Sequence, residues 1–502
     1  MQIVQNDTIP DTNALKSREI NIRLDLAAAY AKLDNVEQVI VNLSKVLSLE
    51  YSDLIYSYIK NDPVFAKVRQ TKSFRSFLAK NKYMKRLSEN SSLYTKYQPN
   101  ITNAEKAAAI SLFWSNVRTF FVYFDQVPNL DWDDEYLKYL NSALQTKSTY
   151  EFYKLLQNMA SILKDGHTNV YPPVELYEKF YATVPLETRM VEGKVLITAV
   201  FDKSLMDTIK VGYEIVRINN QPVEEYANKF IAPYVSSSTE QDYNIRVYHY
   251  SLLKGDIDKT IVLEAIDFDG NHKTLKVERK YSSVVSNKEA VLFEMKDDIA
   301  YIKINSFHNV DTIDSSLKKN EHNIKTSKAL IIDLRDNGGG TTNYELLRFL
   351  AGNSFETTAT KTRLTSGIKL ANSSSLFSWH EFKSSTISPN SNYSYSKPVV
   401  VLIGNKTFSA AEDVVAMFKQ MNRGLLVGDI TAGSTGQPYQ FELPGGGSAR
   451  LVIKRDAFAD GKEFVGYGVK PDVYVPLTEE DVKKGRDPVL KKALEILNNS
   501  FQ

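Results

Sequence analysis

The chain contains no cysteine in its 502 residues, which excludes disulfides, thiol nucleophiles and thiolate metal sites. No apolar run approaches the ~18 residues that a membrane span requires. An excess of charge of one sign is also missing, because 62 basic residues are balanced by 60 acidic ones. Nucleic acid and membrane surfaces are therefore not expected partners. The first residues, Met1 to Asp7, lack the basic and apolar regions of a signal peptide. With 43% hydrophobic residues, the chain can still build large cores.

The most informative stretch is residues 397–421. The apolar run Val399 to Ile403 predicts a strand buried on both faces, and a polar turn then leads into a helical pattern. Ser409 lies where the turn meets this helix, beside first-turn amides that are free to bind an oxyanion. Ser409 and Glu412 also have the spacing of a capping box, which is the commoner use of such a serine. This segment alone leaves both interpretations open.

A second segment, residues 329–342, combines a buried strand with three successive glycines that open another helical pattern. Glycines allow positive φ and let a backbone come close to a ligand, although a flexible loop would also use them. A phosphate-binding loop is excluded, because the segment has neither a Gly-Lys-Ser/Thr ending nor the G-x-G-x-x-G spacing.

A third segment, residues 163–173, carries His167 between an apolar helix and a strand that ends at two prolines. Five other histidines occur in the chain, but none of them stands in such a helix-exit turn. A lone histidine is usually structural. A nucleophilic serine, however, needs a base, and imidazole is the usual base near neutral pH.

Together these segments resemble the S41 family of serine peptidases, which includes the tail-specific and tricorn-core proteases. The order and spacing of the motifs agree over about residues 105–500. The matching motifs are D-G-H at 165–167, D-L-R-x-N-x-G-G at 333–340, T-F-S-A-A-E at 407–412, G-D-x-T-A-G-S-T-G at 428–436 and G-x-G-V-x-P-D at 466–472.

The resemblance implies roles for five residues. Ser409 would be the nucleophile and His167 the general base. The oxyanion hole would combine the Ala410 amide with a glycine amide of the 338–340 run, where Gly339 is favoured over Gly340. No metal ion or organic cofactor is implied.

The family divides by the group that activates the serine. The tail-specific branch uses a lysine at a position where this chain has Gly433, Ser434 and Thr435. Neither Lys406 nor Lys419 stands at that place, so a Ser–Lys dyad is not expected. The tricorn-like branch uses a histidine.

In the tricorn-like branch a C-terminal glutamate helps to orient the histidine, and Glu463 is the nearest candidate here. Gly166 departs from the pattern, because the tricorn core protease has a serine before its histidine. Some acceptor should hold the second imidazole nitrogen in the right tautomer. If Glu463 does not do so, Asp165 or a backbone carbonyl is the next candidate.

The predicted fold is an α/β core of the ClpP/crotonase-like kind, with a PDZ-like β-rich insertion and an all-α N-terminal region. Residues 1–80 are predicted to form helices, either a tetratricopeptide-like hairpin or a helical cap. Residues 81–183 would be a helical lead-in that carries the histidine. Residues 184–285 would be the PDZ-like domain, or else a β-rich spacer, and residues 286–502 the catalytic core. Within the core, residues 354–397 are expected to form a long loop that acts as a lid or specificity wall.

The predicted function is serine endopeptidase action on proteins or peptides through an acyl-enzyme. The alternative is a catalytically inactive peptide- or ligand-binding protein on the same scaffold, since Gly166 and Glu463 could mark lost activity. The N-terminal helices could bind a protein partner. The oligomeric state stays open, and the resemblance suggests a periplasmic or secreted protein whose signal peptide has been removed.

Overall fold

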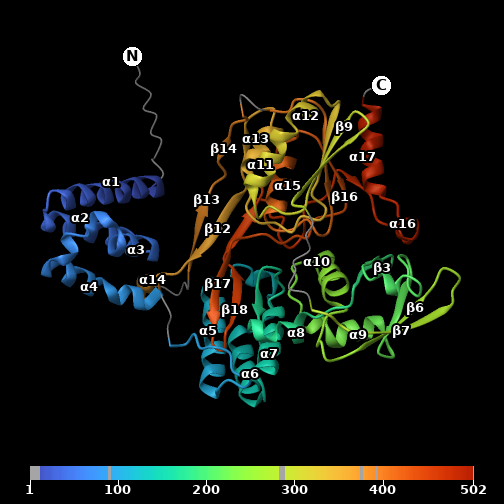
Figure 1. Cartoon of the computed structure of the whole chain (residues 1–502), viewed down its shortest axis with the longest axis horizontal. Helices are drawn as coiled ribbons and strands as arrows, with labels where there is room; N and C mark the ends of the chain where they lie inside the picture. The colour runs from blue at the N-terminus through green and yellow to red at the C-terminus, as the bar shows by residue number, and fades with distance from the viewer. Residues whose placement is uncertain (1–11, 89–91, 282–288, 373–376, 391–393, 501–502) are drawn as a thin grey trace. The chain divides into compact units, whose positions relative to one another are not determined.

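The computed structural model of the chain (Figure 1) divides into two compact units, Met1–Tyr94 and Thr95–Gln502. The residues that it describes lie in five stretches: 12–88, 92–281, 289–372, 377–390 and 394–500. The N-terminal segment considered above for a signal peptide lies outside these stretches, as does the predicted domain boundary at 285/286.

The described secondary structure of the first unit is helical. Its α-helices are α1 (Thr12–Lys32), α2 (Val36–Leu49), α3 (Asp53–Asn61) and α4 (Lys72–Ser88). Asn35 and Ser52 cap α2 and α3 by accepting hydrogen bonds from backbone amides of the first turn. The unit has its own apolar core, in which the rings of Phe65 and Phe74 stack at 6.2 Å.

A six-stranded sheet forms the centre of the second unit, in the order β20-β16-β15-β10-β9-β8. Its strands are β8 (Val291–Lys296), β9 (Ile299–Ile304), β10 (Ala329–Asp333), β15 (Val399–Ile403), β16 (Leu425–Gly428) and β20 (Val473–Tyr474). The strands from β9 to β20 pair in parallel, and β8 pairs antiparallel with β9. All residues of β10 and β15 are buried, which explains their continuous apolar sequences.

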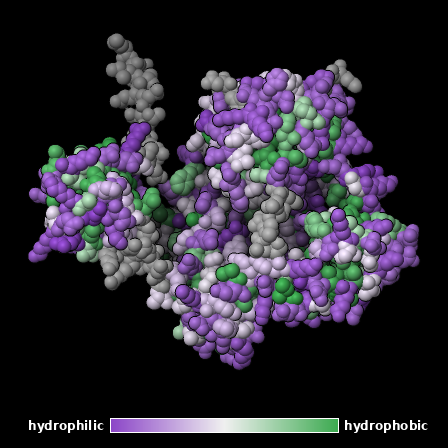
Figure 2. All heavy atoms as spheres, in the orientation of Figure 1, coloured by the Kyte–Doolittle hydropathy of each residue, from purple (hydrophilic) through white to green (hydrophobic). Residues whose placement is uncertain are grey.

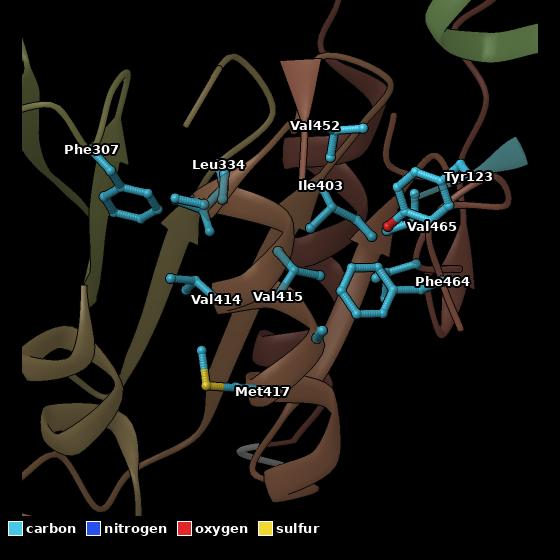
Figure 3. Close-up of a cluster of buried hydrophobic side chains, with 14 of the residues drawn as sticks. Tyr123, Phe307, Leu334, Ile403, Val414, Val415, Met417, Val452, Phe464 and Val465 are labelled. Carbon is cyan, nitrogen blue, oxygen red and sulfur yellow. The ribbon is translucent and has the colours of Figure 1, made fainter. Parts of the chain in front are cut away.

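Helices cover both faces of this sheet, so the unit has a mixed α/β architecture. They are α11 (Val310–Lys319), α12 (Glu321–Thr326), α13 (Tyr344–Leu350), α15 (Ala410–Met421) and α17 (Pro488–Asn499). Figure 3 shows Val414 and Val415 of α15 lying close to Leu334, the residue after β10, and to Ile403, the last residue of β15. Helix α17 packs on the opposite face through its own apolar side chains. The core therefore fixes the turn between β15 and α15 from both sides of the sheet.

A helical layer holds the strand that follows His167. It consists of α5 (Asn103–Phe120), α6 (Trp132–Gln145), α7 (Thr149–Ser161) and a three-stranded sheet of β1 (Asn169–Tyr171), β18 (Gly447–Val452) and β17 (Pro438–Leu443). The buried Tyr153 hydroxyl donates to the Pro444 carbonyl at 2.7 Å and accepts from the Gly447 amide at 3.0 Å. A side chain at position 447 would overlap the Tyr153 ring, so this contact requires glycine.

A separate antiparallel sheet occupies the β-rich segment, in the order β2-β3-β4-β6-β7. Its elements are β2 (Leu186–Val191), β3 (Lys194–Val200), β4 (Glu214–Ile218), β6 (Ile261–Ile266), β7 (His272–Val277) and the covering helix α9 (Val223–Phe230). This sheet has its own apolar core. Between α9 and β6 the chain forms α10 (Glu240–Asn244) and a π-helical turn over Ile245–Ser251, which bring polar side chains toward His167.

The expectation of a long loop over residues 354–397 is wrong. The described part contains β11 (Phe355–Glu356), β12 (Ala359–Leu364), α14 (Gly367–Asn372), β13 (Ser378–Phe382) and β14 (Thr386–Ile387). Strand β12 pairs with β13 and with β19 (Lys454–Ala457), which lies about ninety positions later in the chain. Polar Thr-rich strands of this kind are stabilised by backbone pairing with a distant strand, which an apolar periodicity does not reveal.

Figure 2 shows a face on which hydrophilic residues predominate and hydrophobic ones lie in small groups. Of the helices described, none is both long enough and apolar enough to cross a membrane.

Candidate active site

Ser409 lies at the sharp corner between β15 and α15. Its backbone has φ 59° and ψ −132°, a region that residues other than glycine rarely adopt and that costs about 1–3 kcal/mol. The corner is held by Thr407, whose hydroxyl donates to the Leu334 carbonyl at 2.9 Å and accepts from the Gly404 amide at 3.0 Å. Strained serines at strand-to-helix corners are typical of nucleophile elbows.

The side chain of Ser409 does not cap the helix, because it makes no hydrogen bond to the first-turn amides. The side chain of Glu412 does not return to Ser409 either, and instead binds the loop at 431–434. The capping-box alternative therefore does not describe this corner, and the Ser409 hydroxyl is left to other partners.

The Ser409 hydroxyl lies against His167. Its Nε2 lies 3.0 Å from Ser409 Oγ, and its Nδ1 lies 3.0 Å from Ser434 Oγ. The imidazole is 2% exposed and stacks on the Phe408 ring with centroids 4.4 Å apart and planes 9° apart. The ring is thus fixed by two hydroxyls at its nitrogens and by an aromatic face.

The surroundings of His167 keep its imidazole neutral. Burial lowers its pKa well below the usual 6.5, and the positive charges of Arg450, Arg246 and Lys454 lower it further. A neutral imidazole is the form that can accept a proton from a serine hydroxyl at neutral pH.

Ser434 was quoted in the sequence motifs but received no role there. Its position is set by Glu412, which is fully buried. The carboxylate accepts from the Thr431 hydroxyl at 2.6 Å and from the amides of Gly433 and Ser434, each at 2.7 Å. Burial raises the pKa of Glu412 to about 8, against the opposing effect of these three donors. The signal that could have identified Ser434 was its place, where the tail-specific branch carries its lysine.

The structure also explains why residue 166 is a glycine. A Cβ added there would lie 2.8 Å from Ser434 Oγ, 2.8 Å from Asp242 Oδ2 and 2.9 Å from Arg246 Nη2. The space that a serine at position 166 would occupy is therefore filled by Ser434 and by an ion pair from the β-rich segment. In that pair Arg246 Nε donates to Asp242 Oδ1 at 2.6 Å.

Arg246 extends the packing around the histidine ring. Its guanidinium lies 5.0 Å from the centroid of the Phe408 ring, so Phe408 contacts both this cation and His167. On the same side, the Gly166 amide donates to Ser238 Oγ at 2.9 Å. The β-rich segment thus contributes directly to the walls of the site.

The glycine run lies beside Ser409, as an oxyanion hole requires. A Cβ at Gly339 would be 2.5 Å from Ser409 Cβ and 3.1 Å from the Ala410 nitrogen, so only glycine allows this approach. The Gly339 amide, however, donates to Asn337 Oδ1 at 2.9 Å. Gly340 packs against the backbone of Phe307 and His308. In this arrangement the favoured donor, Gly339, is engaged, while the Ala410 amide stands in the first turn of α15.

Glu463 is not brought to His167, both of whose ring nitrogens have serine partners. Its oxygens instead accept from Arg455 Nε at 2.9 Å and Nη2 at 2.6 Å. Arg455 also binds both oxygens of Asp125, at 2.7 and 2.9 Å. Glu463 therefore belongs to an ion network around a buried arginine. The next candidate, Asp165, accepts from Thr168 Oγ1 at 2.6 Å.

The lysines considered for a dyad are occupied elsewhere. Lys406 pairs with Asp336 at 2.5 Å, and Lys419 pairs with Asp472 at 3.0 Å. Within the described stretches, no three histidine, aspartate or glutamate side chains form a group that could hold a metal ion. The site therefore consists of two serines, a histidine and backbone amides.

Comparisons with known proteins address the family and the fold of the chain. Residues 298–475 match the model of peptidase family S41, which confirms the family resemblance found in the sequence. The carboxy-terminal processing protease CtpA of Bacillus subtilis is 28% identical over 198 residues, which are 38% of each chain. A protein of Chlamydia trachomatis serovar D is 31% identical over 121 residues, which are 22% of this chain and 20% of that protein. The matched stretch thus spans only a fifth of that relative's length.

The fold is also similar to that of a solved structure described as mature CPAF. The TM-score is 0.62, and the match covers 79% of this chain and 98% of the other at 16% identity. At this identity the likeness concerns the fold. The covered share, 79% of this chain, is larger than the 298–475 region that matches the family model.

Proposed function

We propose that this chain, an S41-family protein over residues 298–475, is a serine endopeptidase that hydrolyses peptide bonds through an acyl-enzyme. The observation that carries the proposal is the contact series Ser434–His167–Ser409, with both hydroxyls 3.0 Å from the ring nitrogens. A nucleophile, a base and an orienting group within hydrogen-bond reach are the geometric requirements for this chemistry.

In the acylation step Ser409 Oγ attacks the scissile carbonyl carbon, and His167 Nε2 takes the hydroxyl proton. The imidazolium then gives this proton to the leaving amine, and an ester to Ser409 remains. In the second half, His167 removes a proton from water, the hydroxide attacks the ester, and the proton returns to Ser409 Oγ. The lowered pKa of His167 keeps it ready to accept at neutral pH.

The oxyanion would be bound by the Ala410 amide and by a second donor from residues 338–340. For Gly339 to serve, its amide must leave Asn337 Oδ1, which it contacts at 2.9 Å. Substrate binding can supply this change, since the carbonyl oxygen offers a competing acceptor.

Ser434 would take the orienting place that a carboxylate occupies in other triads. With the imidazole proton on Nδ1, the ring donates to Ser434 Oγ and leaves Nε2 free to accept from Ser409. A hydroxyl stabilises imidazolium less than a carboxylate does, so the structure supports a moderate rather than a fast peptidase.

The finer fold assignments are part of the same proposal. The strand order and flanking helices support a ClpP/crotonase-like core, and the sheet over residues 186–277 with α9 supports a PDZ-like domain. Because Asp242 and Arg246 of this segment contact the site, substrate binding to it would be coupled to His167. A peptide-binding protein without activity is the second candidate, and the engaged Gly339 amide is the observation that favours it.

A reactive-serine probe tests the proposal. A fluorophosphonate should label Ser409 in the full chain, and Ser409→Ala should abolish both labelling and hydrolysis of a denatured protein substrate. His167→Ala should reduce both by several orders of magnitude. The matched control is Ser204→Ala, at an exposed serine in the β-rich segment. Labelling that survives in Ser409→Ala, or turnover that is unchanged in it, would reject the assignment.

A further inference from the structure

A cavity of about 290 Å³ lies beside the catalytic histidine, between α7, β1, β18 and the π-helical turn. Asn169, two residues after His167, is part of its wall and is the neighbour of Arg450 in the β1–β18 pairing. The Asn169 side chain also donates to the Gly166 carbonyl at 2.9 Å. The wall of this cavity is therefore continuous with the backbone that presents His167.

The cavity is lined by cations and tyrosines. Arg246, Lys254 and Arg450 reach it, together with four tyrosines, and its wall contains no aspartate or glutamate. An adjoining cavity of about 150 Å³ shares Lys254 with it and adds Lys154 and Lys179, again with no acidic residue in the wall. Five cations thus surround a space in which no lining carboxylate neutralises them.

Among the described residues, four of these cations, Lys154, Lys179, Lys254 and Arg450, form no ion pair outside the wall either, although the buried Asp165 is near enough to act on the charge of Arg450. In the part of the chain that the structure describes, the buried Arg450 Nε has no hydrogen-bond partner. Two of the lysines contact aromatic rings instead, with Lys154 Nζ 3.7 Å from the Tyr234 centroid and Lys254 Nζ 5.8 Å from that of Tyr181. Burial lowers the pKa of Lys154 to about 8, as expected for a cation without a nearby anion.

A second cavity of similar size provides the contrast. It measures about 300 Å³ and is also lined by arginines and lysines, but acidic residues stand among them. Lys303 and Lys406 both pair with Asp336 at 2.5 Å, and Arg335 pairs with Asp487 at 2.7 Å. Lys303, Lys406 and Arg335 in that cavity are therefore neutralised by carboxylates of the protein. Beside His167, Arg246 is paired with Asp242, but Lys154, Lys254 and Arg450 form no ion pair within the described stretches, and partly buried charge without a counterion is costly unless a ligand of opposite sign binds.

We propose that the cavity beside His167 is a substrate subsite that binds a carboxylate of the peptide, with Arg450 and Lys254 as its principal cations. This inference rests on the proposed peptidase function and adds a preference to it. The tyrosine hydroxyls and rings would hold the remainder of the residue, and the volume, at the small end for ligand pockets, suits one or two residues. The carboxylate belongs either to an acidic side chain or to the end of the substrate chain.

Matched peptides distinguish these two sources. In one series a single glutamate is moved along an otherwise neutral, internally quenched peptide. Each glutamate peptide is compared with a peptide that carries glutamine at the same position. In the other series the same peptide carries a free or an amidated C-terminus. We expect kcat/KM to favour the carboxylate form by about tenfold or more in one series, as expected for a hydrogen bond to a charged group.

Variants then assign the preference to this cavity. Arg450→Met and Lys254→Met should each remove most of the preference, and Lys254→Met, whose side chain does not act on the pKa of His167, should leave cleavage of the neutral peptide nearly unchanged. Lys276→Met, at an exposed lysine of β7, is the matched control and should keep the preference. Melting temperatures establish that each variant is folded, and Lys254 provides the test if Arg450→Met does not fold.

Binding to the Ser409→Ala protein gives a readout that does not depend on turnover. Fluorescence anisotropy of labelled peptides should show tighter binding of the carboxylate form, and Arg450→Met should remove the difference. If the carboxylate and neutral forms of every peptide pair bind and are cleaved equally, the subsite proposal is overturned. Labelling of Ser409 in the same protein would still support the peptidase proposal. A preference that persists in both variants would overturn it as well, because the carboxylate would then bind elsewhere.

Discussion

Glu412 ends the T-F-S-A-A-E motif and Glu463 stands three residues before the G-x-G-V-x-P-D motif, and although both side chains accept hydrogen bonds, they hold different parts of the molecule. Glu412 is fully buried in α15 and binds the loop that carries Ser434. Glu463 is partly exposed and binds Arg455, which also binds Asp125. The first carboxylate positions Ser434, which contacts His167, whereas the second neutralises an arginine away from His167.

The effect of each carboxylate on activity should therefore depend on whether its hydrogen-bond partners contact His167. The expected order of effects on activity is therefore Glu412, then Ser434, then the cations near His167, and last Glu463.

Among these four, the largest effect is expected for Glu412→Ala. Three buried donors lose their acceptor, at a cost of about 1–3 kcal/mol each, and the loop at 431–434 loses its anchor. Because the Ser409 amide donates to the Ser434 carbonyl at 3.0 Å, both serines would move. We expect kcat/KM to fall by about a hundredfold or more, together with a lower melting temperature.

Two controls sharpen this result. Glu412→Gln keeps the shape and one carbonyl acceptor but places an amide donor against one of the three donors, so an intermediate loss is expected. Glu345→Ala, at an exposed glutamate in the first turn of α13, should have little effect. Normal activity in Glu412→Ala would mean that the loop does not depend on this carboxylate.

Ser434→Ala should reduce activity without unfolding the protein. The imidazole would lose the partner of its Nδ1, while Phe408 stacking and the Ser409 contact remain. A loss of about tenfold to a hundredfold in kcat is expected, smaller than the loss for a triad carboxylate. The measurement is kcat at saturating substrate together with the melting temperature. An unchanged kcat would show that the ring is oriented by its packing alone.

The acid limb of the pH profile should lie below the usual histidine range. Activity needs neutral His167, so kcat/KM rises as pH rises through its lowered pKa and is level near neutrality. Arg450→Met removes one of the positive charges that lower this pKa, so the limb should move to higher pH. A neutral peptide is used for the measurement, and Lys276→Met is the control.

The same histidine predicts a stability trend. Its folded pKa lies below the ordinary value of 6.5, so between these two values the unfolded state binds more protons. Stability should therefore rise with pH across this window and fall as pH drops through it. Arg450→Met should narrow the pH range over which stability rises. If neither this range nor the acid limb of the kcat/KM profile moves in Arg450→Met, Arg450 does not influence the pKa of His167.

The sequence predicted those elements whose signal is local. The run Val399–Ile403 coincides with β15, and residues 329–333 form β10, because strands buried on both faces are continuously apolar. Ser409 and His167 were identified through motifs, and the structure brings them together.

The orienting group could not be predicted from such local signals. Ser434 meets His167 across 267 positions of the chain, and a serine in a Gly/Thr-rich loop looks like many others. The need for glycine at position 166 likewise comes from distant residues, because Asp242 and Arg246 of the β-rich segment fill the space of a side chain there. Glu463 was chosen by family position, but whether a carboxylate reaches the histidine depends on tertiary packing, and Arg455 binds it instead.

The smallest effect on activity is expected for Glu463→Gln, and it tests the comparison most directly. Arg455 is 8% exposed and would keep Asp125 but lose one ionic partner, so stability should fall by about 1–3 kcal/mol. Since no contact of Glu463 leads to His167, kcat should change by less than about threefold. Asp125→Asn removes the other carboxylate of the same arginine and should give a similar loss of stability. If Glu463→Gln lowers kcat a hundredfold while Asp125→Asn does not, Glu463 acts on the histidine during catalysis and the contrast with Glu412 fails.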